Sequence, residues 1–331
     1  MAFKKLDTVQ WGMIGAGNVT EVKSGPAFCK IEDSKLVAVM ARTFDKVKDY
    51  AQRHDVSTYY TDAQQLIDDP QVNAIYVATP PSTHMEYAIR AMRAGKPVYV
   101  EKPMAMSVKE CEEMNRISEQ IGIPLFVAFY RRGMEYFNQV KQLFSEGKIG
   151  TILTVDTKIV QAPFASDLDP KKHSWRIDRN IGGEGYFVDL APHAFDILDY
   201  LLGEIETARG NAVNIAGNYA VADTVAASWK FKSGILGTGL WTFSSTQSAE
   251  SDTVIITGTR GTISFSIFKL TPIEVRTDTG VEMFDFDRPQ HIQMGLIQTI
   301  VDELTGRGTC PSTGISGMRT AKVMEQILEG H

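Results

Sequence analysis

A glycine turn directly after the first apolar segment constrains this chain more than any other feature. Residues 8–14 predict a strand, and Gly15-Ala16-Gly17 follows at once, before residues that predict a helix. A glycine turn between a strand and a helix points backbone N–H groups at an anion, typically a pyrophosphate. Glycine turns are common, but this context favours a dinucleotide-binding fold. Thr20 stands where the usual fingerprint has glycine or alanine, so close packing of the helix does not follow from the turn.

Apolar strands and helix-like segments alternate through the first part of the chain. Ser107, with Glu110 three residues later, has the capping-box pattern of a helix start. Alternation of this kind is typical of a doubly wound parallel sheet, and we assign such a Rossmann domain to residues 1–128. Further strands are predicted at residues 35–40, 72–78, 98–100 and 124–130, and helices at residues 21–31, 45–54, 61–68, 83–94 and 107–122.

The pattern changes in the second part, where strands come as hairpins instead of alternating with helices. Their alternate positions often hold Thr, Ser or Gly, which predicts a mostly antiparallel sheet with one covered face. We therefore expect residues 129–331 to form an α+β domain with a large open sheet, whose C-terminal helix could pack back on the first domain. Strands are predicted at residues 149–160, 221–231, 235–243, 253–257 and 262–268, and helices at residues 134–146, 293–304 and 317–328.

The composition excludes several classes of function. A formal net charge of -6 provides no basic excess to neutralise the phosphates of a nucleic acid. No apolar run approaches the roughly 18 residues that a membrane helix needs. Cys29, Cys111 and Cys310 have no short mutual spacing, which predicts neither a disulfide framework nor a metal site. We expect a cytoplasmic protein without a bound metal and without nucleic-acid or membrane partners.

The end of the second predicted strand bears on the choice of cofactor. An NAD-binding protein usually places Asp or Glu there, about twenty residues after the glycine turn, to bind the ribose 2′-hydroxyl. This chain has Ala41-Arg42 instead, with Lys46 nearby. A cation at this place suits a 2′-phosphate, so NADP(H) is favoured over NAD(H). An exposed arginine that merely begins a loop would explain the same residues.

Two later strands of the first domain end in polar residues. In an open parallel sheet the ligand crevice lies at the carboxyl ends of the strands. Thr79 and Pro80 follow one strand, and His84 begins the next helix. From the sequence alone, a cofactor contact and a polar residue of the first helical turn explain His84 equally well. Glu101 and Lys102 follow the next strand, before a proline. Taken alone, such a pair is more commonly a solvated ion pair at a strand end.

In the second domain, Asp189 and His193 are four residues apart in a segment predicted to be helical through Leu202. A helix would set both side chains on one face, and a carboxylate beside a histidine can orient and tune the imidazole. On spacing alone, a capping aspartate and a structural histidine are the commoner explanation. Pro192 is tolerated only in a first turn or at a kink, which leaves the local geometry open.

Several short motifs occur in an order and spacing that resemble the Gfo/Idh/MocA family of oxidoreductases, the glucose-fructose oxidoreductase and inositol dehydrogenase type. The resemblance covers nearly the whole chain. It departs from the usual pattern at Glu184, which interrupts a glycine triplet, and at Pro192. The motifs are Gly15-Ala16-Gly17-Asn18, Ala78-Thr79-Pro80-Pro81 with His84, Ala94 to Pro103, Glu146 to Gly150, Trp175-Arg176, the glycines before Asp189, and His193 with Asp196 through Gly203.

The resemblance implies hydride transfer between a nicotinamide and a carbon that bears a hydroxyl or carbonyl group of a sugar or polyol. It places the family's catalytic lysine on Lys102, its aspartate on Asp189 and its histidine on His193. It also implies that Trp175 and Arg176 contact the cofactor. The full set of expected cofactor-binding residues is Gly15, Ala16, Gly17, Asn18, Val19, Arg42, Lys46, Thr79, Pro80, His84, Glu101, Lys102, Trp175 and Arg176.

Two other functions remain open at this point: an NAD-retaining glycosidase that oxidises its substrate transiently, and a non-enzymatic regulator that senses a cofactor. The lysine, aspartate and histidine set argues against the regulator, because a sensor needs no proton transfer. A one-faced sheet of this size normally buries its outer face, so we expect a homodimer or homotetramer. By their location alone, Tyr130, Arg131, Phe164 and His173 are candidates for the substrate pocket.

Overall fold

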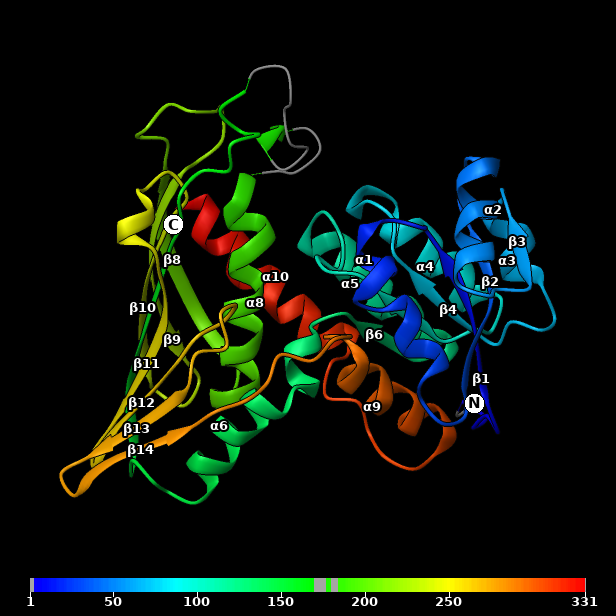
Figure 1. The fold of residues 1–331 in the computed structure, drawn as a ribbon. Coiled ribbons are helices and arrows are strands. Elements are labelled where there is room, and N and C mark those ends of the chain that lie inside the picture. The colour runs from blue at the N-terminus through cyan, green and yellow to red at the C-terminus, as the bar shows by residue number, and fades with distance from the viewer. Residues whose placement is uncertain (1–2, 170–176, 180–183, 331) are drawn as a thin grey trace. The chain divides into compact units, whose positions relative to one another are not determined.

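The computed structural model describes residues 3–169, 177–179 and 184–330 (Figure 1). The chain divides into two compact units. The first holds residues 1–134 and 289–318, and the second holds residues 135–288 and 319–331. The chain therefore returns from the second unit to the first before its end, and the helix α10 (Gly314–Glu329) begins in the first unit and ends in the second.

The first unit contains a sheet of six parallel strands in the order β3-β2-β1-β4-β5-β6. Every residue of β4, β5 and β6 is buried. Continuous burial of this kind arises when helices cover both faces of a parallel sheet. The predicted Rossmann fold is thus confirmed. The strands are β1 Val9–Ile14, β2 Ser34–Met40, β3 Thr58–Tyr60, β4 Ala74–Val77, β5 Val98–Val100 and β6 Leu125–Val127.

Local sequence explains both ends of α5 (Val108–Ile121). The Ser107 hydroxyl accepts a hydrogen bond from the Glu110 N–H (3.2 Å), and Gly122 ends the same helix with a φ of 73°. One expected helix, 21–31, is interrupted, because Pro26 has no N–H with which to continue it and lies in a separate 3-10 turn. The helices and 3-10 turns are α1 Asn18–Val22, η1 Gly25–Cys29, α2 Phe44–Arg53, α3 Ala63–Asp68, η2 Pro81–Thr83, α4 His84–Arg93, α5 Val108–Ile121, η3 Tyr130–Gly133 and α9 Met294–Thr305.

The second unit contains a sheet of eight strands in the order β14-β13-β12-β11-β7-β10-β9-β8. Only the β7–β10 pair is parallel among these described strands. In β9 the residues alternate strictly between buried and more exposed positions, as they do when one face of a sheet packs on a core. The strands are β7 Ile152–Val160, β8 Ile205–Val213, β9 Thr224–Phe231, β10 Leu236–Thr242, β11 Ser251–Gly258, β12 Gly261–Phe265, β13 Ile273–Thr277 and β14 Gly280–Phe284.

Helices α6 (Glu135–Ser145) and α8 (Gly185–Leu202) lie on the same side of this sheet (Figure 1). The Phe195 ring on α8 packs against Trp229 of β9 (5.1 Å between centroids) and Trp241 of β10 (5.3 Å). Gly237 makes room for the Trp229 indole, because an added Cβ would lie 2.1 Å from that ring. The core of this unit therefore lies between α8 and the centre of the sheet.

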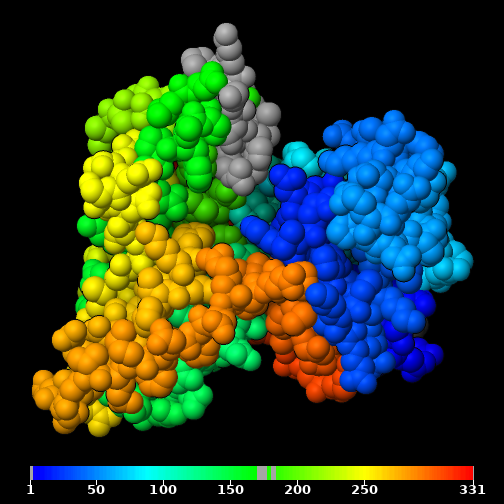
Figure 2. Space-filling view, viewed as in Figure 1, coloured from blue at the N-terminus to red at the C-terminus, as the bar shows by residue number. Residues whose placement is uncertain are grey.

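Three features of the second unit differ from the expectation. Helix α8 begins at Gly185 and continues through Pro192, which lies in its interior and not in its first turn. Strand β8 was not expected, because its apolar residues do not recur at every second position. The hairpin of β13 and β14 was also not expected, and it forms the orange lower-left corner of Figure 2. None of the described helices is both long and apolar enough to cross a membrane.

Candidate active site

The glycine turn after β1 requires glycine for a steric reason. Gly15 has a φ of 111°, and a Cβ there would lie 2.5 Å from the Ala78 carbonyl oxygen at the end of β4. A Cβ on Gly17 would meet nothing within 4 Å, so open space lies in front of the turn at that residue. Asn18 and Val19 begin α1 and are exposed and partly exposed. The turn thus offers backbone to a ligand at the junction of β1 and β4, where the strand order reverses.

Thr20 does not prevent close packing behind this turn. Its side chain is fully buried, and its hydroxyl donates a hydrogen bond to the Gly17 carbonyl (2.8 Å). Its own carbonyl accepts a hydrogen bond from the Tyr50 hydroxyl (2.9 Å) and lies 2.2 Å from where a Cβ on Gly25 would be. The close approach that the fingerprint usually obtains from its third glycine is therefore made at Gly25, which sequence analysis did not single out.

Two exposed cations follow the carboxyl end of β2. Arg42 comes directly after the buried Ala41, and Lys46 lies in the first turns of α2. Within the described part of the chain, neither side chain makes a hydrogen bond or ion pair. Both are therefore available to an anionic ligand at this edge of the sheet.

His84 joins the two loops that follow β4 and β5. It is fully buried, its Nδ1 lies 2.9 Å from the Pro103 carbonyl oxygen, and its Nε2 lies 2.8 Å from the Thr79 carbonyl oxygen. Burial away from water lowers the pKa of His84. A neutral imidazole donates to one of these two oxygens. In this structure the ring nitrogens therefore contact the protein backbone, and Thr79 and Pro80 are held at the same edge.

Glu101 and Lys102 follow β5 directly, and they differ in exposure. Lys102 is partly exposed, whereas Glu101 is 8% exposed. The Glu101 carboxylate accepts hydrogen bonds from the Tyr76 hydroxyl (2.7 Å), from the Gln293 amide (2.7 Å) and from the Lys102 N–H (3.2 Å). A buried carboxylate with three donors is fixed in place, and it fixes the backbone that carries Lys102.

Gln293 enters this network from the segment that returns to the first unit. It is 1% exposed, and its side-chain oxygen accepts a hydrogen bond from the Tyr99 hydroxyl (2.8 Å) while its amide donates to Glu101. The rings of Tyr76 and Tyr99 are stacked at 4.9 Å. Burial, and then the negative charge of Glu101, raise the pKa of both tyrosines well above the usual value. Both hydroxyls therefore stay protonated and act as hydrogen-bond donors.

The second unit carries the other two residues of the expected catalytic set. Asp189 and His193 extend from the same face of α8, Asp189 partly exposed and His193 5% exposed. The His193 imidazole packs nearly perpendicular to the Phe268 ring, with 5.9 Å between centroids and 82° between the rings. Phe268 follows β12 and is partly exposed, and sequence analysis did not single it out.

Other predicted residues have distinct outcomes. Trp175, Arg176 and His173 lie outside the described residues. Tyr130 and Arg131 are buried in the first unit, where the guanidinium lies 4.8 Å from the centre of the Tyr130 ring.

Phe164 of the second unit is 55% exposed and lies 5.5 Å from the Tyr186 ring. It is therefore placed at a surface of that unit, beside the first turn of α8.

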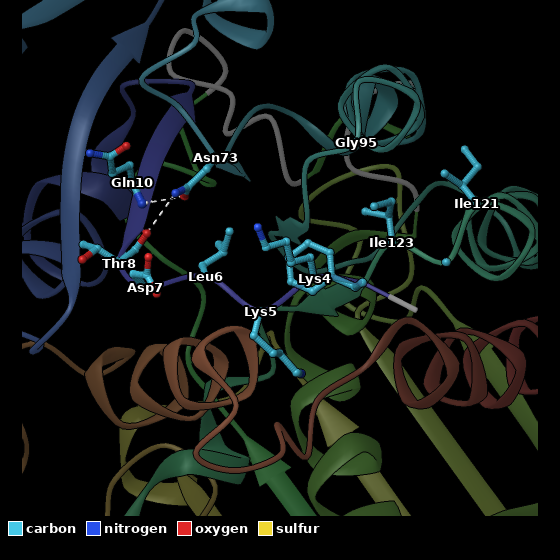
Figure 3. Close-up of a pocket in the computed structure, with 12 residues that line it drawn as sticks. Lys4, Lys5, Leu6, Asp7, Thr8, Gln10, Asn73, Gly95, Ile121 and Ile123 are labelled. Atoms are coloured by element: carbon cyan, nitrogen blue, oxygen red, sulfur yellow. Dashed lines mark hydrogen bonds between the residues drawn. The ribbon is translucent and has the colours of Figure 1, made fainter. Parts of the chain in front are cut away.

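A cavity of about 800 Å³ lies at the opposite edge of the first sheet (Figure 3). Leu6, Asn73 and Ile123, which line it, precede strands β1, β4 and β6 and therefore stand at their amino ends. The Asn73 side chain there accepts from the Gln10 N–H and donates to the Thr8 carbonyl, which holds β1 beside β4. This cavity is separate from the carboxyl ends, where the glycine turn and Lys102 lie.

The carboxyl edge of the first unit fits a nicotinamide dinucleotide. The open space at Gly17 admits a phosphate close to backbone, and Arg42 and Lys46 provide positive charge beyond β2. Lys102 stands two strands along the same edge from β1. When bound, such a cofactor supplies a nicotinamide carbon that accepts or delivers hydride.

Two family models match this chain. One describes an oxidoreductase family with an NAD-binding Rossmann fold and matches residues 9–129, and the other describes the GFO/IDH/MocA C-terminal domain and matches residues 137–264. Oxidoreductase P35 of Formosa agariphila is 35% identical over 96% of this chain and 97% of its own length. The myo-inositol 2-dehydrogenase of Thermotoga maritima is 28% identical over 68% of this chain and 66% of its own.

One further relative and one solved structure are also similar to this chain. The 1,5-anhydro-D-fructose reductase of Ensifer adhaerens is 27% identical over 69% of this chain and 67% of its own length. A solved structure of levoglucosan dehydrogenase with NADH and levoglucosan superimposes with a TM-score of 0.85 over 98% of this chain and 97% of that chain, at 23% identity. The second of these similarities concerns the fold alone.

Proposed function

This chain belongs to the GFO/IDH/MocA family of NAD-binding oxidoreductases that act on CH–OH groups, and on that premise we propose that it is a dehydrogenase or reductase of a cyclic sugar or polyol. One observation carries the proposal. Lys102 stands at the same edge of the sheet as the glycine turn, and a buried, triply hydrogen-bonded Glu101 fixes its backbone. Relatives named for inositol and anhydrofructose support the substrate class.

The roles of the side chains follow from their chemistry. The Lys102 ammonium would stabilise negative charge on the substrate oxygen and so lower the proton affinity of that oxygen. His193 would accept the hydroxyl proton during oxidation and return it during reduction. Asp189, four residues earlier on the same face of α8, would orient the imidazole or bind a neighbouring hydroxyl. Hydride and proton thus leave the same CH–OH group in oxidation, which gives a carbonyl.

We assign the expected cofactor-binding set to NADP(H) in preference to NAD(H). The support is the exposure of Arg42 and Lys46, which have no protein partner among the described residues, and the absence of an acidic residue directly after β2. Within the set, we propose that His84 acts by bridging the loops after β4 and β5, since both ring nitrogens lie against carbonyl oxygens of these loops.

We also propose that the enzyme is a homodimer or homotetramer that associates through the open face of the eight-stranded sheet. Leu236, Leu240 and Ile255 lie on the face that points away from the core, and they are 56%, 38% and 39% exposed. Exposed apolar side chains grouped on one sheet face are typical of an interface. Light scattering at micromolar concentration would contradict this association if it gave the mass of a monomer.

The catalytic proposal is tested with two substitutions and a panel of cyclic polyols and sugars, with NADPH or NADH followed at 340 nm. Lys102→Ala and His193→Asn should each lower kcat by at least about 100-fold, the usual size of a lost acid–base or electrostatic contribution. Lys148→Ala, at an exposed ion pair with Glu282, is the matched control and should change kcat less than about twofold. Turnover that survives both catalytic substitutions would refute the assignment.

None of the described residues, nor any of the relatives named above, favours the NAD-retaining glycosidase or the cofactor-sensing regulator. Net formation of reduced cofactor in the same panel separates a dehydrogenase from both alternatives, because a retaining glycosidase gives no net reduction and a sensor gives no turnover.

A further inference from the structure

The loop after β12 holds an aromatic ring against the residue that we assign as the proton acceptor. The rings of Phe268 and His193 pack nearly perpendicular to each other, and Phe268 is partly exposed, whereas the preceding Ile267 is 1% exposed. Part of Phe268 is therefore accessible next to the imidazole. The loop that carries it belongs to the second unit, as His193 does.

The backbone of this loop is held by one carboxylate. Asp252 on β11 accepts hydrogen bonds from three consecutive N–H groups, those of Ile267 (2.8 Å), Phe268 (2.7 Å) and Lys269 (2.8 Å). Arg288 also donates a hydrogen bond to the Phe268 carbonyl. Charge-assisted bonds to successive N–H groups leave the loop little freedom at the residue that bears the ring.

Buried polar groups hold the base of the loop as well. Ser266 is fully buried, its N–H donates to the Tyr136 hydroxyl (3.0 Å), and its own hydroxyl accepts from the Thr271 N–H (2.9 Å). The Tyr136 hydroxyl in turn donates to the Thr271 carbonyl (2.8 Å). Leu270, with a φ of 51°, lies in the left-handed region inside this frame. A loop with so many fixed groups around a partly exposed aromatic side chain suits a binding surface better than a simple connection.

We propose that Phe268 is a substrate-contact residue whose ring stacks on the C–H face of a cyclic sugar or polyol, and that Asp252 is the positioning residue that holds it there. A substrate hydroxyl that hydrogen-bonds to His193 brings its ring carbons within van der Waals reach of an aromatic ring that already touches the imidazole. A ring-shaped polyol presents several C–H groups on one face, while an acyclic polyol does not hold them in a plane. The stacking therefore selects cyclic substrates, and this inference rests on the proposed function.

The kinetic test compares Phe268→Ala with Phe268→Tyr, which keeps the ring, and with Phe144→Ala, a partly exposed phenylalanine of α6 as matched control. For the cyclic substrate with the highest kcat/KM in the panel, Phe268→Ala should raise KM about tenfold with kcat changed less than about threefold. The tyrosine variant and the control should keep the original KM. A KM shift no larger than that of the control, or a loss confined to kcat, overturns the proposal.

The positioning role of Asp252 has its own test. Asp252→Ala should raise KM for the cyclic substrate as Phe268→Ala does. Asp252→Asn, which keeps one acceptor oxygen, should raise this KM less than Asp252→Ala does. The double variant with Asp252→Ala and Phe268→Ala should have a KM close to that of Asp252→Ala alone. Full additivity of the two KM effects would show that Asp252 does not act through this ring.

A binding measurement without turnover separates this proposal from the assignment of the catalytic residues. In saturation-transfer difference NMR with myo-inositol, irradiation of aromatic protons should transfer saturation to the ligand C–H protons in the original protein and in Lys102→Ala. Phe268→Ala should lose most of this signal, and Phe144→Ala should keep it. Equal signals in the two phenylalanine variants overturn the stacking, whatever Lys102→Ala does to turnover, and so does the absence of any transfer in the original protein.

Discussion

The hydrogen bonds of Gln293 lead to a quantitative prediction for Gln293→Leu. The substitution removes the bond from the Gln293 amide to Glu101 (2.7 Å) and the bond from the Tyr99 hydroxyl to Gln293 (2.8 Å). Loss of a donor to a buried carboxylate costs about 1.5–3 kcal/mol, and an unsatisfied buried hydroxyl costs about 1–3 kcal/mol. Burial of the additional apolar atoms of leucine returns about 1 kcal/mol. The folded first unit should therefore lose roughly 1.5–5 kcal/mol of stability.

Hydrogen exchange with mass spectrometry measures this loss at the site. Peptides that cover β5 and the first turns of α9 should exchange faster in Gln293→Leu, because the opening free energy of these elements falls. Gln298→Leu is the matched control on the same helix, since Gln298 is partly exposed and, among the described residues, donates to Asp302 within α9 (3.0 Å). It should change stability by less than about 0.5 kcal/mol.

Gln293→Glu adds a dependence on pH with a definite sign. It would place a second carboxyl beside the Glu101 carboxylate, which should raise the pKa of one of the two in the folded protein. A group whose folded pKa is raised contributes stability that is fully present below its unfolded pKa and is lost as pH rises through the folded pKa. The variant should thus be more stable near pH 5 than near pH 8, by urea denaturation. If Gln293→Leu loses no more stability than Gln298→Leu, the reasoning about this hydrogen-bond network is refuted.

Two further predictions concern the cofactor edge. Arg42→Ala should weaken NADPH binding about 10- to 100-fold and NADH binding less than about twofold in a fluorescence titration, since only NADPH carries the 2′-phosphate. Lys35→Ala, at the amino end of β2, is the control. Equal losses of affinity for both cofactors in Arg42→Ala would contradict the assignment of Arg42 to the 2′-phosphate. Next to the glycine turn, hydrogen bonds from Arg53 chiefly lower the pKa of Glu21 to about 2. A folded pKa below the ordinary 4.5 stabilises the protein at pH values above 4.5, and this stability is lost as the pH falls toward 2. The original protein should therefore be slightly more stable than Arg53→Ala above pH 4.5, and this difference should vanish as the pH falls toward 2, by urea denaturation. A difference that persists unchanged at low pH would show that the Arg53 bonds do not act through the charge of Glu21.

Local patterns predicted the first unit well because its strands and helices are coded by residues close in sequence. The strand before Gly15 and the capping box at Ser107 each depend on neighbours within a few positions, and both are found in the structure. The hairpin of β9 and β10 was predicted for the same reason. Strand β8 was not, because its apolar residues do not alternate regularly and it is formed at the edge of the sheet through its pairing with β9.

The sequence by itself determined the fold class and the oxidoreductase family, since motif order and spacing suffice for these. It predicted the three residues that we assign to catalysis through the resemblance to that family. Only the tertiary structure showed the partners that hold them: Gln293, which is 192 residues from Glu101, and Phe268 against His193. Apolar periodicity reports that a face is buried, but it does not report which distant polar group satisfies a buried carboxylate. Such partners are chosen by packing, because every buried polar group must find a donor or acceptor wherever the folded chain provides one.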